Sequence, residues 1–323
     1  MSALSRRSAA ALVLASPVVL AARGAGANVR ELRVDYATYN PVSLVLRSKG
    51  WLEDEFRGDG IAIRWVLSAG SNKALEFLNA GSLDIGSTAG AAALVARING
   101  NPVRSVGVYS KPEWTALVTR PDSGIAKPAD LRGRRVAVTR GTDPHIFLVR
   151  AIAAAGLSER DIKAVPLQHA DGRLALVRGD VDAWAGLDPI MAAAEIENGA
   201  TLFHRDAEAN TWGVLNTREA FLAAQPQLVA RVLKVYERAR VWSRANGAEL
   251  AEILGKEAKL AEPIIARQLE RTDLSHARIG PAQVATIKAA GEALQAAGVI
   301  AANVDIAAVS RELVDASLGP AAS

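Results

Sequence analysis

Hydrophobic positions in the first two thirds of the chain switch repeatedly between the two-residue spacing of a strand and the three- and four-residue spacing of a helix. Residues 31–36 and 61–67 have the strand pattern, and residues 41–49 and 72–80 have the helical pattern. Strands that alternate with helices of about ten residues are typical of a mostly parallel sheet with helices on its faces. The pattern therefore predicts an α/β fold.

Residues 80–90, which read A-G-S-L-D-I-G-S-T-A-G, join a predicted helix to a short strand and then to a second helix at residues 91–98. Gly81 can adopt the left-handed conformation that ends a helix. Ser87 and Thr88 are expected to cap the second helix, where free N–H groups and the positive end of the helix dipole favour an anion. The alternative is that both residues are simple helix caps without a ligand.

The same pattern recurs further along the chain. Residues 176–184 align on residues 78–86, with Gly179 on Gly81 and Asp182 on Asp84. Chance similarity is the alternative, but both copies lie at a junction between a helix and a strand. We therefore predict two similar α/β lobes, each of which presents a loop after a strand.

Strands at residues 135–138, 164–167 and 183–186 form the second predicted series, and residues 212–216 resemble a strand that returns to the first lobe. From Arg218 onward the chain is amphipathic and helical, and no further strand is predicted. These helices must therefore pack on a sheet that is already built, most simply that of the first lobe.

The predicted architecture is two Rossmann-like lobes joined by a hinge with two chain crossings. The first lobe would comprise residues 28–117 plus 216–323, and the inserted second lobe residues 118–215. Trp114 and Trp212 would flank the two crossings. The cleft between two hinged lobes is the natural place for a ligand.

The N-terminal segment has the pattern of a cleaved secretory signal over residues 1–27. Arg6-Arg7 form its basic part, residues 8–22 its apolar run and residues 25–27 an A-x-A cleavage site. A membrane span is disfavoured because about 20 apolar residues are needed and Arg23 follows the run directly. The paired arginines resemble a twin-arginine signal, which leaves the export route open.

Composition narrows the possible functions. The formal net charge of +4 falls to +1 without residues 1–27, which contain three arginines and no acid, so no nucleic-acid or membrane-surface patch is needed. The absence of cysteine excludes a thiolate nucleophile, a disulfide and lipidation at a cysteine. The histidines lack metal-ligand spacing, and no G-x-S-x-G elbow is present. We expect no metal, no cofactor, no catalysis and a soluble protein of the periplasm.

The order of these motifs carries a family resemblance. A signal segment and an early strand with a Tyr-containing turn precede residues 81–88, residues 129–133 lead into a Val-Ala-Val strand, and residues 181–184 precede Asp188-Pro189. The chain resembles the periplasmic substrate-binding proteins of ABC importers, which have the type II periplasmic binding protein fold. Within them it is most similar to the aliphatic sulfonate, taurine and nitrate group.

The resemblance implies a monomeric receptor that binds a small anionic organic ligand, most simply an aliphatic or aryl sulfonate, and delivers it to an ABC permease and its ATPase. The implied ligand contacts come from loops of both lobes: Tyr39, Asn40, Ser87, Thr88, Gly141, Thr142, His145, Trp184 and Asp188. Trp184 could instead be a core tryptophan, and His145 could face solvent. The alternatives are another small solute (taurine, nitrate, a carboxylate or a neutral heteroaromatic), a sensor that presents its ligand to a membrane receptor, and an enzyme of the same fold.

Three positions depart from the pattern of the sulfonate-binding group. Asp143-Pro144 stands where small or hydroxyl residues are usual. Pro144 removes one N–H donor, and Asp143 would repel an anion unless its carboxylate turns inward as a helix cap. Ala89-Gly90 and Leu187 predict a roomier and less polar pocket. The receptor class is compatible with these departures, but they leave the ligand open.

Overall fold

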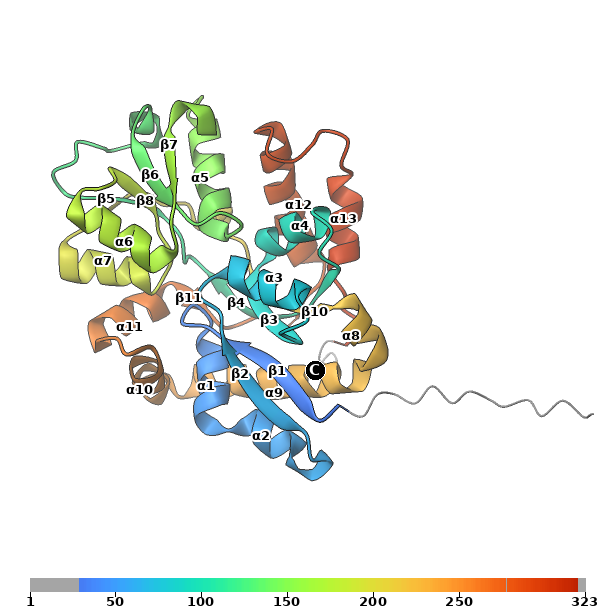
Figure 1. Cartoon of the computed structure of the whole chain (residues 1–323). Coiled ribbons are helices and arrows are strands. Elements are labelled where there is room, and N and C mark those ends of the chain that lie inside the picture. The colour runs from blue at the N-terminus through green and yellow to red at the C-terminus, as the bar shows by residue number, and fades with distance from the viewer. Residues whose placement is uncertain (1–28, 277, 319–323) are drawn as a thin grey trace, which may run out of the picture.

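The strands of the described residues form two separate mixed β-sheets, each covered by helices (Figure 1). The computed structural model describes residues 29–276 and 278–318, so the predicted signal segment lies outside the described residues. The first sheet has the order β11-β4-β10-β3-β1-β2. Its strands are β1 (Glu31–Tyr36), β2 (Ala62–Leu67), β3 (Ile85–Ala89), β4 (Val103–Pro112), β10 (Gly213–Arg218) and β11 (Thr272–Asp273).

The second sheet has the order β7-β6-β8-β5-β9. Its strands are β5 (Leu117–Thr119), β6 (Arg135–Val138), β7 (Lys163–Pro166), β8 (Ala183–Ala185) and β9 (Thr201–His204). In each sheet one strand, β1 or β6, runs parallel to both of its neighbours, and a strand that returns, β10 or β5, is antiparallel to both of its own. The two lobes therefore share one plan, as the sequence predicts.

Helices alternate with the strands along the chain in each lobe. The first lobe contains α1 (Pro41–Lys49), α2 (Trp51–Phe56), α3 (Ser71–Asn79) and α4 (Gly90–Ile98), and the second lobe contains α5 (Asp143–Ala154), α6 (His169–Arg178) and α7 (Ile190–Asn198). The C-terminal helices are α8 (Glu219–Ala224), α9 (Pro226–Ala245), α10 (Gly247–Ala258), α11 (Glu262–Glu270), α12 (Pro281–Ala296) and α13 (Ile306–Leu313). Within the described residues, none of these helices is both long enough and apolar enough to span a membrane.

The repeated stretch makes the same contacts in both lobes. Gly81 and Gly179 have positive φ angles of 67° and 81° after α3 and α6. Asp84 then accepts a hydrogen bond from the backbone N–H of Arg33 at 2.9 Å, and Asp182 accepts one from that of Arg135 at 2.8 Å. Each arginine side chain also donates to the carbonyl of the glycine in its own lobe. The repeat predicted from the sequence is therefore a structural repeat.

The C-terminal helices pack mainly on the first lobe, as predicted. Val232 and Tyr236 of α9 and Ile287 of α12 belong to the large apolar core of that lobe. Two features were not predicted. The short strand β11 follows α11 and pairs with β4, and Ile264 of α11 packs on Ala192 and Ala193 of α7 in the second lobe (Figure 1).

The two chain crossings fall at residues 113–116 and 205–212. The predicted lobe boundaries, after residues 117 and 215, need correction because each cuts into a strand. Leu117 already pairs in the second sheet, and β10 joins the first sheet from Gly213. Hydrophobic spacing cannot locate these points, since an extended segment has the same alternation before and after it changes sheets.

Candidate ligand-binding site

The loops at the carboxyl ends of the parallel strands meet between the two lobes. A methyl group placed on Gly70, before α3, would lie 3.0 Å from Nε2 of His169 at the start of α6. One placed on Gly141, before α5, would lie 3.6 Å from Cβ of Asn72 in α3. In open α/β sheets ligands bind at this end of the strands, and the candidate site therefore lies among these loops.

Ser87 and Thr88 lie in β3 and not at a helix cap, so the predicted turn at these residues is wrong. The cap position of α4 is Ala89, whose side chain offers no hydrogen bond. The hydroxyl of Thr88 donates to the carbonyl of Ala89 at 2.9 Å and accepts from Nδ2 of Asn216 at 2.8 Å. Strand pairing with β10 overrides the local capping preference, because the ladder extends to Ala89, three residues beyond the end of the predicted strand at Gly86.

Asp35 accepts hydrogen bonds from both the N–H and the hydroxyl of Ser87. It was not predicted as a site residue from the sequence. Its carboxylate accepts the Ser87 N–H and hydroxyl, each at 2.9 Å, and it is fully buried beside Ser68. Burial raises the pKa of Asp35 to about 7. The sequence carried one signal, a carboxylate in a strand that helices cover on both faces.

The first N–H groups of α4 also have protein partners. The N–H of Gly90 donates to the carbonyl of Trp212 at 2.9 Å, and that of Ala91 donates to the hydroxyl of Thr211 at 3.2 Å. Thr211 and Trp212 belong to the second crossing. This helix end is therefore occupied by the hinge, whereas the sequence suggested an open anion site.

Asp143 is neither a cap nor directed into the cleft. Its carboxylate accepts Nε1–H of Trp114 at 2.8 Å, the N–H of Thr211 at 2.9 Å and the hydroxyl of Thr211 at 2.7 Å. Burial raises its pKa, and these three donors oppose the rise. The carboxylate thereby joins α5 to both hinge crossings, and the repulsion of an anion expected from the sequence is reduced.

Aromatic rings line the first-lobe side of the hinge. Tyr39 makes an edge-to-face contact with Trp114 at a centroid distance of 6.0 Å, and Tyr109 lies 6.3 Å from the same ring. The hydroxyl of Tyr39 donates to the carbonyl of Ser87 at 3.0 Å. Tyr39 and Ser87, both predicted from the sequence, are thus brought together.

Neutral donors that are buried without a hydrogen bond of ordinary geometry among the described residues lie close to these rings. They include Nδ2 of Asn40 and the hydroxyls of Tyr109, Ser110 and Tyr236. Asn40 caps α1 through Oδ1, which accepts the Ser43 N–H at 3.2 Å, and its amide N–H₂ faces the oxygen of Tyr236, where it opposes the rise of the tyrosine pKa. Burial raises the pKa of both tyrosines well above their usual value, so both hydroxyls stay protonated. Sequence reasoning missed Tyr109 and Tyr236, because no local motif links α9 to a strand end.

Four of the predicted residues in the second lobe contact other parts of the protein. Thr142 donates its hydroxyl to the carbonyl of Thr139 at 2.6 Å. Nε2 of His145 lies 3.1 Å from Oε1 of Glu159. Trp184 is fully buried in β8 within a core that includes Leu176, which favours the alternative of a core tryptophan. Of the second-lobe predictions, Gly141 and Asp188 lie where the lobes meet, Gly141 against α3 and Asp188 against Arg271 of the C-terminal segment.

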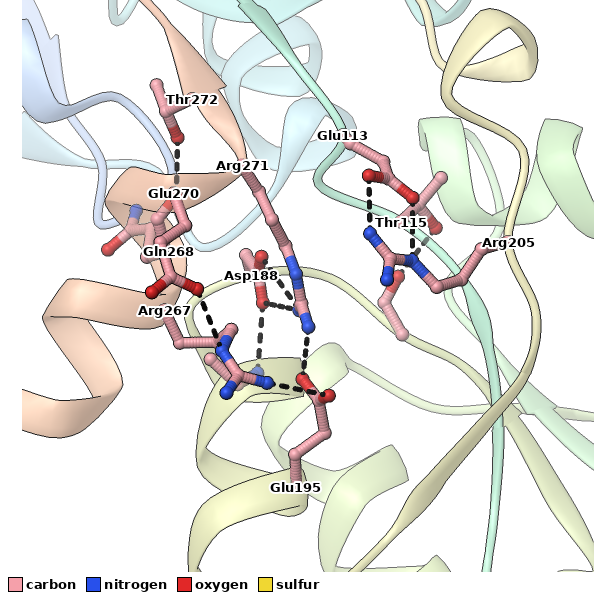
Figure 2. Close-up of polar contacts among 12 residues, drawn as sticks. Glu113, Thr115, Asp188, Glu195, Arg205, Arg267, Gln268, Glu270, Arg271 and Thr272 are labelled. Atoms are coloured by element: carbon pink, nitrogen blue, oxygen red, sulfur yellow. Dashed lines mark hydrogen bonds and ion pairs between the residues drawn. The ribbon is translucent and has the colours of Figure 1, made fainter.

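Asp188 belongs to an ion cluster with Arg271 and Glu195 (Figure 2). Nη1 of Arg271, at the end of α11, lies 3.3 Å from its carboxylate, and Nη2 donates to Glu195 of α7 at 2.6 Å. Asp188 also accepts the N–H of Ala192 at 2.9 Å. Burial raises the pKa of Asp188 to about 7 against the opposing effect of Arg271. Its carboxylate thus binds the C-terminal segment to the second lobe.

A groove of about 720 Å³ lies between α5 and the end of α12. Apolar side chains, among them Val149, Ile152 and Val299, line it together with charged residues such as Arg140 and Glu159. The unpartnered buried donors lie elsewhere, so this groove does not match the chemistry of the predicted anion site. No group of three or more His, Asp or Glu residues suited to a metal occurs in the part of the chain that the structure describes.

Comparison with known proteins defines the class. A family model described as NMT1/THI5 like matches residues 42–249, and the chain belongs to this family. A protein of Escherichia coli strain K12 named as an aliphatic sulfonates-binding protein is 30% identical over 264 residues, which cover 80% of this chain and 81% of the relative. The predicted family is thereby confirmed.

Two solved structures give the more particular likeness. The alkanesulfonate-binding protein SsuA of Xanthomonas axonopodis pv. citri, bound to MOPS, is 25% identical with a TM-score of 0.78, covering 87% of this chain and 97% of that one. The periplasmic aliphatic sulphonate binding protein SsuA of Escherichia coli is 27% identical with a TM-score of 0.72, covering 86% and 90%. The fold is therefore that of the periplasmic binding proteins, and the similar proteins are solute receptors of ABC import.

Proposed function

We propose that this protein is an extracytoplasmic receptor that binds a small organic sulfonate between its lobes and delivers it to an ABC permease and its ATPase. The carrying observation is the group of buried donors on Asn40, Tyr109 and Tyr236, which have no acceptor in ordinary hydrogen-bond geometry among the described residues and come from the cap of α1, from β4 and from α9. A buried donor without a partner costs about 1–3 kcal/mol, which an acceptor oxygen of a ligand would recover. The similar sulfonate-binding proteins support the same ligand class.

Neutral donors suit a receptor that must release its ligand. A sulfonate spreads one negative charge over three oxygens, and each can accept a hydrogen bond from an amide or hydroxyl. Hydrogen bonds to a charged group contribute about 1.5–3 kcal/mol each. Three such bonds can hold the anion without a buried counter-ion, whose separation from the ligand would oppose transfer to the permease.

The signal segment, the periplasmic location and the boundaries of the two lobes belong to the same proposal. Residues 1–27 act as a cleaved signal, and the mature monomer works in the periplasm. The first lobe comprises residues 29–112 with 213–318, and the second comprises residues 117–204, as strand pairing supports. Charged residues on both lobes would dock the permease.

Taurine, nitrate, a carboxylate and a neutral heteroaromatic remain alternative ligands. Nitrate has no organic group to contact the rings of Tyr39, Tyr109 and Trp114, whereas a neutral heteroaromatic has no anionic oxygens for the buried donors. Ligand size and charge therefore discriminate among these candidates.

An enzyme of the same fold is the alternative from another class. Cysteine chemistry is excluded, since the chain has none. Thr139 lies 3.2 Å from Nδ1 of His169, but its hydroxyl donates to the carbonyl of Leu167 at 2.7 Å, so the histidine does not take its proton. That contact therefore lacks the arrangement of an activated nucleophile.

Thermal unfolding of residues 28–323 with a panel of ligands tests the proposal. The panel contains methane-, ethane- and butanesulfonate, benzenesulfonate, taurine, nitrate and acetate. A ligand at 100 times its Kd adds about 2.7 kcal/mol, which raises the Tm by a few degrees in a chain of this size. We expect a shift with one sulfonate class. A shift only with taurine, nitrate or acetate would reassign the ligand, and none with any sulfonate would contradict the proposal.

A further inference from the structure

The first turn of α3 inserts between two loops of the second lobe. Gly70 precedes this helix with a φ of 166°, an extended conformation open to any residue, so its backbone does not require glycine. The space around Gly70 does require a glycine. A methyl group at Gly70 would lie 2.8 Å from Oδ1 of Asn72 and 3.0 Å from Nε2 of His169. The missing side chain lets the two lobes come together at this point.

His169 presents an unpartnered acceptor to this contact. Its side chain is almost fully buried, and Nε2 has no hydrogen-bond partner among the described residues. The Thr139 hydroxyl gives its proton to the carbonyl of Leu167 at 2.7 Å, so it must accept from Nδ1–H of His169 at 3.2 Å. The neutral ring then carries no proton on Nε2. Burial lowers the pKa of His169 to about 3.

We propose that the contact between Gly70 and His169 sets ligand affinity by controlling how completely the lobes close. The proposal rests on the proposed receptor function, and both residues act as positioning residues that need not touch the ligand. A receptor binds through its closed form, so its apparent Kd rises as the closed fraction falls. Crowding or charge at this contact would therefore weaken every ligand by a similar factor.

No charged side chain contributes to the lowered pKa, whose cause is burial. The elements around the ring carry these charged groups: Asp35 beside Ser68, Lys73 and Glu76 of α3, Arg135 of β6, Arg140 before α5, Asp171, Arg173 and Arg178 of α6, and Glu195 and Glu197 of α7. Several have partners of their own: Lys73 pairs with Glu76, Arg140 with Glu159 and Arg173 with Glu197.

Ligand affinity is expected to fall as the pH falls. When the lobes separate, His169 meets water and regains a pKa near its ordinary 6.5, whereas the closed form holds it neutral down to about pH 3. Closure is thus fully favourable above about pH 6.5 and weakens by about tenfold per pH unit below it. The wild-type affinity should fall about tenfold between pH 6 and pH 5.

The glycine provides the first test. Gly70→Ala should weaken ethanesulfonate and butanesulfonate binding by about tenfold each, with the urea midpoint unchanged. Gly247→Ala is the matched control, since a methyl group there meets nothing within 4 Å. In a His169→Ala background only the contact with Asn72 of the same helix remains, so Gly70→Ala should then lose most of its effect on affinity. Equal losses with and without the ring would overturn the proposal.

The histidine provides the second test. His169→Gln cannot titrate, so the wild-type to variant affinity ratio should fall about tenfold between pH 6 and pH 5. Both proteins retain Asp35 and Asp188, whose titrations cancel in this ratio. A ratio independent of pH would contradict the role of His169.

A distance measurement separates this inference from the proposed function. The chain has no cysteine, so spin labels can be placed at Asn79→Cys and Arg178→Cys, exposed positions at the ends of α3 and α6. Gly70→Ala or a pH of 5 should shift the label distances to longer values, with or without a sulfonate. If no sulfonate binds but the shift occurs, only the proposed ligand fails. Unchanged distances, or a wild-type protein without a short-distance population, would overturn the closure contact.

Discussion

At the scale of single residues, the site is defined by polar groups whose partners are missing or already taken. Ser87 and Thr88 have their hydroxyls engaged by Asp35, Ala89 and Asn216. Asn40, Tyr109 and Tyr236 have donors to spare. The difference matters because a ligand oxygen gains most from donors that no protein atom satisfies.

Tyr236→Phe should separate binding from stability. The variant removes a hydroxyl whose proton has no acceptor among the described residues, so the free energy of unfolding should change little. Sulfonate affinity should fall by about tenfold, the effect of about 1.4 kcal/mol. Isothermal titration calorimetry and urea unfolding measure the two quantities. Tyr36→Phe, at a half-buried tyrosine packed under Arg47, is the control and should leave affinity unchanged. Loss of stability without loss of affinity would remove Tyr236 from the site.

At the scale of elements, hydrophobic spacing predicted most strands and helices and the repeat between the lobes. It failed at β3, where pairing with β10 carries Ser87 and Thr88 into the sheet. A proline at Thr88 would consequently break the first sheet and could not test binding alone. The site was predicted less well, since Asp35, Tyr109 and Tyr236 meet through tertiary packing that local patterns do not encode.

The repeat supplies a matched pair of substitutions. Asp84 is almost fully buried and binds both Arg33 and Arg218, at 2.7 and 2.8 Å. Asp182 is partly exposed and lies 3.6 Å from Nε of Arg135. Asp84→Asn should therefore lower the free energy of unfolding by about 1–3 kcal/mol, and Asp182→Asn by less. Urea unfolding of both variants gives the comparison, and equal losses would show that burial does not set the strength of these anchors.

At the scale of the whole molecule, two ion-paired groups connect parts of the chain that are distant in sequence. Figure 2 shows Arg271 between Asp188 and Glu195, and Arg205 paired with Glu113. The first group is buried and joins α11 to the second lobe. The second joins the two hinge crossings and is partly exposed.

Arg271→Gln should destabilise the protein far more than Arg205→Gln. Removal of one partner from a buried ion cluster costs about 3–5 kcal/mol. Asp188 would lose its cation, and Glu195 would keep only Arg267, at 3.3 Å. An exposed pair contributes about 0–1 kcal/mol. Differential scanning calorimetry should show a lower Tm for the first variant and almost none of that change for the second. Similar Tm values would mean that Asp188 and Glu195 are stabilised without Arg271.

The late position of β10 in the chain affects the order in which the two sheets form during synthesis. All five strands of the second sheet lie within residues 117–204, so they can pair as soon as that segment has emerged. The first sheet has a gap between β3 and β4 until β10, at residues 213–218, is available to fill it. The half that is synthesised first therefore completes its sheet last. Residues 29–112 must wait for the chain that follows them before their sheet is complete, with two strand edges still open to other partners.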